Sequence, residues 1–142
     1  MIYETFSPGE TYSLGERMGR KATGGMIITL DGDLGAGKTL FTKGFAKGLG
    51  VTEPVSSPTF TILQEYDGCR LPMYHFDVYR IGDPGEMEEI GFDDFIYGDG
   101  VSLIEWSHLI SELIPEEAVA ITIERDPERG DDYRRITVED RR

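Results

Sequence analysis

The chain has 142 residues, enough for one domain with a sizeable core, and we expect a single domain over residues 1–142. Its 27 acidic and 14 basic residues give a formal charge of −13, which argues against tight binding of nucleic acid or of an anionic membrane surface by the chain alone. The single cysteine, Cys69, excludes an internal disulfide framework, and the lack of an export signal or of a membrane-length apolar run favours a cytoplasmic location.

The first third of the chain alternates predicted strands and helices. A short strand is expected over residues 2–6, followed by a helix to about residue 22, whose start is indicated by Ser7 as N-cap and a proline in the first turn. The apolar, β-rich run over residues 26–30 predicts a buried strand. Apolar and basic residues then alternate at helical spacing over residues 40–49, which predicts a second helix.

Between this strand and this helix lies the most informative segment of the chain, GDLGAGKT over residues 32–39. It matches the phosphate-binding loop (P-loop) pattern G-x-x-x-x-G-K-[ST] at every fixed position. The glycines let successive backbone N–H groups point at phosphate oxygens, while Lys38 can reach the β- and γ-phosphates and the Thr39 hydroxyl can hold Mg²⁺. No guanine-reading [NT]-K-x-D element is present, so ATP is the expected nucleotide. The predicted contacts of this segment and of the residue after it with the nucleotide are Gly32, Asp33, Leu34, Gly35, Ala36, Gly37, Lys38, Thr39 and Leu40.

The remaining elements predict an α/β fold with a central mixed sheet flanked by helices. Residues 59–66 and 73–79 are β-rich runs around an Asp-Gly turn, which predicts an antiparallel pair within the α/β alternation. The elements after this pair are a short helix, a strand, a helical stretch and two strands joined by a polar loop, over residues 83–90, 101–105, 106–114, 118–124 and 133–138.

Hydrolysis requires more than a P-loop, because a carboxylate near Mg²⁺ and a group that orients water are also needed. Glu105 ends the apolar strand at residues 101–105, where an acidic residue can reach a metal beside a P-loop; the alternative is an acidic cap for the helix that follows. Asp77 shares one face of its predicted strand with His75 and Tyr79. Such a polar face is costly to bury without a function, and the alternative is a solvated outer face.

The loop before the antiparallel pair, at residues 55–60, lies where many P-loop proteins have a mobile switch segment. Hydroxyl groups in this loop could sense the γ-phosphate or Mg²⁺, although the composition by itself indicates only a loop.

Four motifs hold a characteristic order and spacing across nearly the whole chain. They are the P-loop, residues 56–61 (SSPTFT), residues 75–80 (HFDVYR) and residues 104–106 (IEW). Together they closely resemble the TsaE family, the small bacterial ATPases of tRNA threonylcarbamoyladenosine biosynthesis. The resemblance implies a cytoplasmic ATP-binding protein with a central mixed sheet and weak intrinsic, Mg²⁺-dependent ATPase activity. It also implies two partners, the threonylcarbamoyl transferase subunit and its paralogous companion, through which tRNA is modified at adenosine 37.

Carried over to this sequence, the resemblance assigns catalytic roles to Lys38, Asp77 and Glu105. Lys38 would bind the phosphates, while Thr39 and Glu105 would hold Mg²⁺. Asp77 would stand near the metal or the catalytic water. The metal site implied by the resemblance is therefore Thr39, Glu105 and Asp77.

The resemblance also extends the nucleotide site beyond the P-loop. Ser57 and Thr59 would form the switch, and Thr11 would border the nucleotide. Arg129, in the polar loop, loosely matches a late nucleotide-contacting position of the family. Leu40 is a small departure, because a second threonine often follows the P-loop in the family.

Two other functions stay open at this point. A small-molecule kinase would share the P-loop but needs a substrate lid, usually rich in Arg, whereas the Arg residues here are scattered and mostly late in the chain. A non-hydrolysing ATP sensor would not need catalytic carboxylates, and the presence of both Asp77 and Glu105 counts against it.

Overall fold

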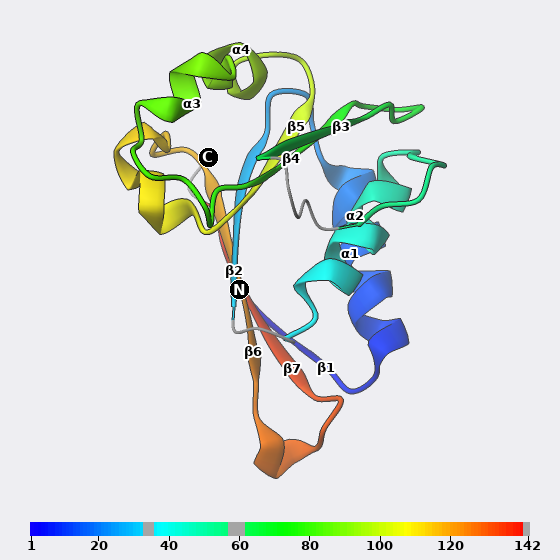
Figure 1. Ribbon diagram of the computed structural model, residues 1–142. Helices are drawn as coiled ribbons and strands as arrows, with labels where there is room; N and C mark the ends of the chain where they lie inside the picture. The colour runs from blue at the N-terminus through cyan, green and yellow to red at the C-terminus, as the bar shows by residue number, and fades with distance from the viewer. Residues whose placement is uncertain (33–35, 57–61, 141–142) are drawn as a thin grey trace.

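The computed structural model describes residues 1–32, 36–56 and 62–140, which form a seven-stranded sheet with helices on both faces (Figure 1). The strand order is β1-β7-β6-β2-β5-β4-β3. The strands are β1 (Ile2–Thr5), β2 (Ile27–Gly32), β3 (Leu63–Tyr66), β4 (Met73–Asp77), β5 (Val101–Glu105), β6 (Val119–Arg125) and β7 (Arg134–Glu139). The helices are α1 (Pro8–Lys21), α2 (Lys38–Gly48), α3 (Glu86–Glu89), α4 (Phe92–Ile96) and the 3₁₀ helices η1 (Ser107–Leu113) and η2 (Pro127–Arg129).

The sheet is mixed, which confirms the predicted fold class. β2 runs parallel to both β5 and β6, and β4 runs parallel to β5. β3 pairs antiparallel with β4, as predicted, and β1 and β7 add antiparallel strands beside β6. The carboxyl ends of the parallel strands β2, β4 and β5 therefore meet at one edge of the sheet, which is the usual place for a ligand site in such folds.

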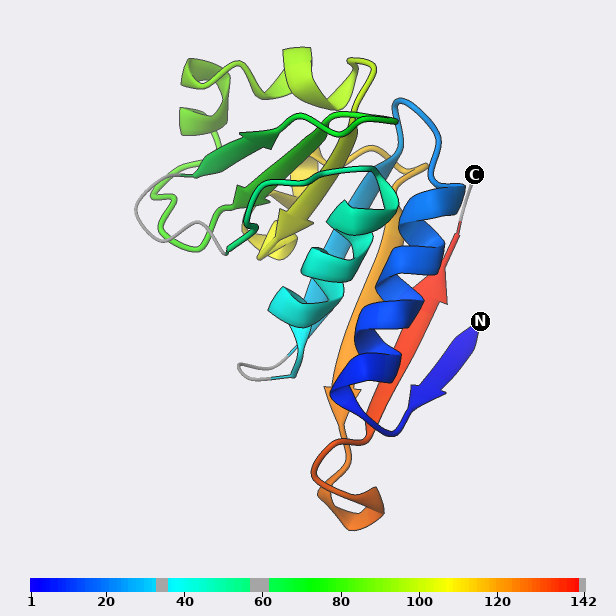
Figure 2. The same ribbon diagram turned by 90° about the vertical axis from the view of Figure 1, so that its right-hand side faces the viewer.

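The sheet separates two cores. α1 and α2 lie side by side across one face (Figure 2) and cover a core that includes Phe41 and Leu103. α3, α4 and η1 lie on the other side of the sheet (Figure 1), over a core that includes Phe92 and Ile104. Because successive strand residues point to opposite faces, Glu105 faces the α1–α2 side, as Leu103 does.

α1 and α2 approach each other closely enough for their backbones to touch. A Cβ atom on any of four glycines would collide with a main-chain carbonyl oxygen of the facing helix; they are Gly15, Gly19, Gly44 and Gly48. The four-residue spacing within each helix places both of its glycines on one face. The contact therefore holds the helix that begins at Lys38 at a fixed distance from α1.

α1 begins as the sequence predicts. The Ser7 hydroxyl oxygen accepts a hydrogen bond from the backbone N–H of Glu10 at 3.1 Å, and the Glu10 carboxylate accepts one from the N–H of Phe6 at 3.2 Å. This cap sets the rotation of the first turn and leaves Thr11 on its buried side, 2% exposed.

The structure differs from the prediction at short elements. Residues 59–61 of the strand predicted over 59–66 lie outside the described residues, and the described part pairs from Leu63 onward. β4 ends at Asp77, two residues earlier than predicted. The sequence does not predict α4, because a five-residue helix is too short for a hydrophobic period to show. None of the helices within the described ranges is long and apolar enough to span a membrane.

Candidate functional site

The predicted P-loop connects the end of β2 with the start of α2. β2 ends at Gly32 and α2 starts at Lys38, so the strand and the helix predicted on either side of the loop are confirmed. Gly32 and Gly37 have φ angles of 154° and 98°, and a Cβ on Gly32 would also collide with the carbonyl oxygen of Ile123 on β6. Both positions therefore require glycine. The predicted contacts outside the described residues are Asp33, Leu34, Gly35, Ser57 and Thr59.

Lys38 places its ammonium group against the carboxyl edge of the sheet. Its Nζ lies 3.8 Å from Oε1 of Glu105 and 5.2 Å from the ring centroid of Trp106. Thr39 follows with an exposed side chain and Leu40 is half-buried, so the first turn of α2 presents a cation and a hydroxyl group together. Lys43 and Lys47, further along the helix, are exposed and line a separate groove on α2.

Glu105 is buried at the end of β5, 5% exposed, between two basic side chains. Its Oε2 lies 2.7 Å from Nε2 of His75 on β4, while its Oε1 faces Lys38. η1 begins at Ser107 after Trp106 without any side-chain cap bond. Since the Glu105 carboxylate is engaged by Lys38 and His75, the helix-cap alternative has no support in the structure.

Asp77 lies beside Glu105, because the two residues are partners in the parallel β4–β5 register. Asp77 is half-buried, and its Oδ1 accepts a hydrogen bond from the backbone N–H of Tyr79 at 3.0 Å. Burial raises the pKa of Asp77, against the lowering effect of the Tyr79 N–H, and the charge of Glu105 raises it further. His75 on the same strand face is 1% exposed, so this face is not the solvated surface of the alternative interpretation.

A third carboxylate, Asp31 on β2, also lies in the field of Lys38. Burial raises the pKa of Asp31, its electrostatic interactions with His108 and Lys38 lower it, and that with Glu105 raises it. Among the residues that the structure describes, no three His, Cys, Asp or Glu side chains are grouped closely enough to hold a metal by themselves. Glu105 and Asp77 offer carboxylate oxygens side by side, and Mg²⁺ commonly binds through one or two carboxylates together with water and substrate phosphates.

Trp106, the residue after Glu105, has a φ of 62°. Few non-glycine residues adopt this backbone conformation. This turn brings its ring 4.7 Å from that of Tyr79 and 5.8 Å from that of His108, measured between centroids. The aromatic side chains form a wall beside the Lys38 ammonium group. Strained backbone of this kind is concentrated at functional sites.

Thr11 and Arg134 border the described end of the P-loop. The Thr11 hydroxyl lies 2.7 Å from that of Thr5, and its methyl group would be 3.8 Å from a Cβ on Gly37. Arg134, on β7, donates a hydrogen bond from Nε to the carbonyl oxygen of Ala36 at 2.8 Å. Thr11 therefore lies at the loop, and its contact with the nucleotide stays a prediction. Arg134 connects the loop to β7, on the far side of β6 from β2.

Arg129 has its contacts at the turn end of the β6–β7 hairpin. Its Nη1 lies 2.8 Å from the Glu4 carboxylate, and its guanidinium group is 4.6 Å from the ring centroid of Tyr133. Within the described residues of the same hairpin, it is Arg134 that forms a hydrogen bond with the P-loop.

Comparison with known proteins shows the family of the chain. The family model described as "Threonylcarbamoyl adenosine biosynthesis protein TsaE" matches residues 5–136. The chain belongs to the TsaE family. It is 51% identical to a protein from Bacillus subtilis over 95% of this chain and 82% of that protein, and 43% identical to one from Treponema pallidum over 82% and 86%. Both relatives are named tRNA threonylcarbamoyladenosine biosynthesis protein TsaE.

A solved structure supports the TsaE fold independently of the family model. The crystal structure of Bacillus subtilis YdiB is similar with a TM-score of 0.82 and 46% identity, covering 97% of this chain and 83% of that one. The similarity therefore extends beyond the P-loop to the whole sheet.

Two contacts within this TsaE fold are not predicted from the sequence. The sequence places His75 only on a polar strand face, although its burial against Glu105 follows from that same alternation once β4 and β5 are paired. Arg134 has no motif around it, and the strand order β7-β6-β2 brings it to Ala36, which follows β2. The first contact had a sequence signal and the second did not.

Proposed function

We propose that this protein binds ATP with Mg²⁺ at its P-loop and hydrolyses it slowly, with stimulation by partner proteins. The observation that carries the proposal is the placement of Glu105, whose carboxylate ends β5 at 3.8 Å from the Lys38 ammonium group. A carboxylate at that point can hold the metal of a P-loop ATPase. Membership of the TsaE family gives the cellular role, which is tRNA threonylcarbamoyladenosine biosynthesis.

In this proposal the groups at the carboxyl edge of the sheet have separate roles. Backbone N–H groups of the loop and the first turn of α2 hold the phosphates, and Lys38 turns from Glu105 toward the β- and γ-phosphates. Thr39 and Glu105 hold Mg²⁺, which neutralises charge on the phosphate oxygens when bound. Asp77, beside Glu105, ligates the same ion or orients the attacking water.

Other residues complete the proposed nucleotide site. Thr11 borders the P-loop, Arg129 reaches the nucleotide from the β6–β7 hairpin, and Leu40 supports the first turn of α2. Ser57 and Thr59 form the switch that senses the γ-phosphate. We treat residues 1–142 as one domain, which the continuous seven-stranded sheet supports.

The partners in this proposal are the threonylcarbamoyl transferase subunit and its paralogous companion, in the cytoplasm. The charge of −13 supports contact with tRNA through these proteins and not through this chain. Residues 81–124 contain neither Lys nor Arg, so a large part of the chain offers no cation to a phosphate backbone.

The decisive experiment measures ADP release from Mg-ATP with no acceptor added, first with the purified protein and then with both partner proteins. We expect slow release that the partners increase. Release that depends on a small-molecule acceptor would identify a kinase instead. Tight ATP binding without any release, with or without the partners, would identify a sensor.

A second experiment tests the contact with tRNA and the nucleotide switch. We expect the isolated chain to bind tRNA poorly in a gel-shift titration at near-physiological salt, and submicromolar binding would contradict the proposal. Partner capture should differ between ATP and ADP; equal capture would leave residues 56–61 as an ordinary loop.

A further inference from the structure

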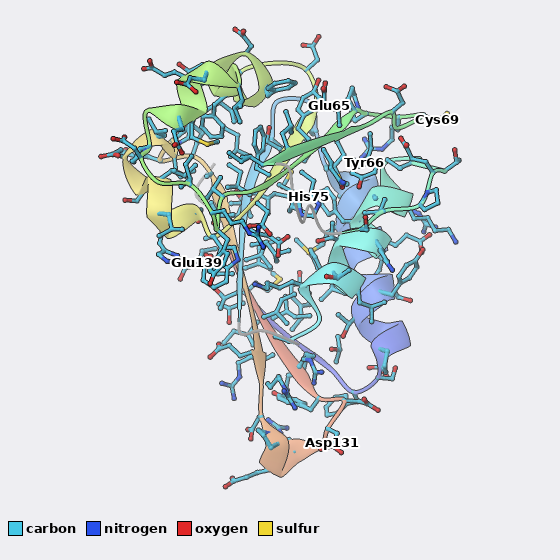
Figure 3. The ribbon with its side chains drawn as sticks, viewed as in Figure 1. Glu65, Tyr66, Cys69, His75, Asp131 and Glu139 are labelled. Atoms are coloured by element: carbon cyan, nitrogen blue, oxygen red, sulfur yellow. The ribbon has the colours of Figure 1, made fainter. Side chains whose placement is uncertain are left out.

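His75 is a buried polar residue that the proposed reaction has not yet used. It lies on β4 with its side chain on the α2 side of the sheet and is 1% exposed. Figure 3 labels it in the layer between the sheet and the helices α1 and α2. In the β4–β5 register, Asp77 is the direct neighbour of Glu105, and His75 lies diagonally behind it on the same face. The diagonal position lets the imidazole reach the Glu105 carboxylate from inside the protein, at 2.7 Å.

The other ring nitrogen of His75 determines the direction of this hydrogen bond. Nδ1 is buried, and no group among the described residues forms a hydrogen bond with it. A proton on Nδ1 would be a buried donor without an acceptor within residues 1–32, 36–56 and 62–140, which is costly, whereas a lone pair there costs less. The ring therefore carries its proton on Nε2 and donates it to Oε2 of Glu105.

This bond distinguishes the two oxygens of Glu105. Oε2 is occupied by the His75 N–H, and Oε1 is left facing the Lys38 ammonium group on the P-loop side. Hydrogen bonds of this kind to a ligating carboxylate fix its orientation and its basicity, and their loss typically weakens a metal site about 10–100-fold.

We infer that His75 is a positioning residue for the metal site, whose Nε2–H···Oε2 hydrogen bond aims Oε1 of Glu105 at the ion. The inference rests on the proposed function, since it requires Mg²⁺ at Glu105. It assigns to the histidine of the HFDVYR segment a role separate from that of Asp77. His75 acts through Glu105 and does not touch the nucleotide.

The test compares His75→Leu, which removes the donor, with His75→Gln, whose amide N–H can approach the position of Nε2. The probe is Mn²⁺, titrated into the protein saturated with ADP and followed by electron paramagnetic resonance. We expect His75→Leu to weaken Mn²⁺ binding about 10–100-fold and His75→Gln to restore most of it. ADP affinity in the presence of a chelator should stay at the parent value in both variants.

A matched control is Ser102→Ala on β5. Ser102 is also buried, and its hydroxyl has no hydrogen-bond partner among the described residues, but it lies on the opposite face of the sheet from Glu105. This variant should bind Mn²⁺ as the parent does. Parent-like Mn²⁺ affinity in His75→Leu, or an equal loss in His75→Leu and a folded His75→Gln, would overturn the inference.

A measurement on the unmodified chain keeps the inference testable if His75→Leu fails to fold. The ¹⁵N ring spectrum should show His75 protonated at Nε2, with His108→Gln used to assign the signals of the two histidines. Protonation at Nδ1 alone would overturn the inference. If the parent–ADP complex bound no Mn²⁺ at all, the proposed function itself would fail and the inference with it, whereas parent binding that His75→Leu retains defeats the inference alone.

Discussion

On one face of the sheet, α1 and α2 pack backbone against backbone, whereas on the other face α3, α4 and η1 pack through their side chains. A Cβ on Gly44 would collide with the Tyr12 carbonyl oxygen, so the first layer has no room for even a methyl group. The second layer packs through larger side chains, such as Phe76 and Phe92, whose ring centroids are 5.1 Å apart. All the side chains proposed for catalysis lie on the first face or at its edge. The comparison shows that the positions of the site residues depend on the layer of α1 and α2. In that layer a small shift of either helix cannot be absorbed by a change of side-chain rotamer.

The two layers also differ in charge. α2 carries Lys38, Lys43 and Lys47 and no acidic residue. Residues 81–124, which include α3, α4 and η1, contain no Lys or Arg and hold a large share of the acidic residues. The strongly acidic composition is therefore unevenly distributed, and we expect function and stability to follow the same division.

The largest expected effect is that of Lys38→Ala on ATP affinity. Removing a largely buried, charge-assisted phosphate contact should weaken Mg-ATP binding roughly a thousandfold. The control is Lys43→Ala on the same helix, which removes an exposed cation and should bind like the parent. Calorimetric titration alongside a thermal melt measures both, and unchanged affinity in folded Lys38→Ala would show that the P-loop is not the nucleotide site.

Glu105→Ala should cut hydrolysis by about a hundredfold and leave nucleotide binding largely intact, because the metal stabilises charge mainly in the transition state. Glu112→Ala removes the same side chain from η1 in the acidic layer and should hydrolyse ATP at the parent rate. ADP release in the presence of the partner proteins provides the measurement. A parent-like rate in Glu105→Ala would remove Glu105 from the catalytic assignment.

Gly44→Ala should destabilise the protein by about 2 kcal/mol, although Ala is intrinsically the better helix former by about 1 kcal/mol. The added methyl group forces α1 and α2 apart at the Tyr12 carbonyl oxygen. Gly82→Ala, near α3, meets only the flexible Glu86 side chain at 3.6 Å and should change stability by no more than about 0.5 kcal/mol. Denaturant unfolding measures both, and equal effects would contradict the contrast between the two layers.

The smallest expected effect is that of Asp77→Asn on the stability of the protein without nucleotide. Burial raises the folded-state pKa of Asp77, so the parent should lose stability relative to Asp77→Asn as the pH rises from the ordinary Asp pKa through the raised one. At neutral pH Asp77→Asn should therefore melt above the parent, while its hydrolysis falls as in Glu105→Ala.

Glu4→Gln should change the melting temperature at neutral pH in the opposite direction to Asp77→Asn. The hydrogen bond from Tyr133 lowers the pKa of Glu4, so its contribution is present at neutral pH and is lost as the pH falls through the lowered value. Glu4→Gln should melt below the parent at neutral pH and approach it in acid. Melting curves over a pH series test the pair, and a lower melting temperature for Asp77→Asn at neutral pH would contradict the assigned sign.

Much of the fold follows from local sequence signals. The glycine pattern at residues 32–39, the N-cap at Ser7 and the antiparallel pair around the Asp-Gly turn each reflect interactions within a few residues, and the described parts of each are found in the structure. The alternation along β4 correctly places His75 and Asp77 on one face.

The features that the sequence does not predict depend mainly on contacts between residues far apart in the chain. The hydrogen bond between His75 and Glu105 requires the β4–β5 register, and the bond from Arg134 to Ala36 joins residues 98 apart in the sequence. α4 is missed for a different reason, since a helix of five residues is too short for a hydrophobic period to show. Local patterns therefore identify the residues of the site more readily than the bonds that hold them.

The left-handed turn at Trp106 also gives the protein an optical label. Trp106 is the chain's single tryptophan, and the Lys38 ammonium group lies 5.2 Å from its ring centroid. Indole emission responds to a charge held against the ring. With excitation at a wavelength that tyrosine does not absorb, the fluorescence of the unlabelled protein thus comes from one point beside the P-loop, so stopped-flow mixing can test in real time whether Lys38 leaves the ring when a nucleotide binds.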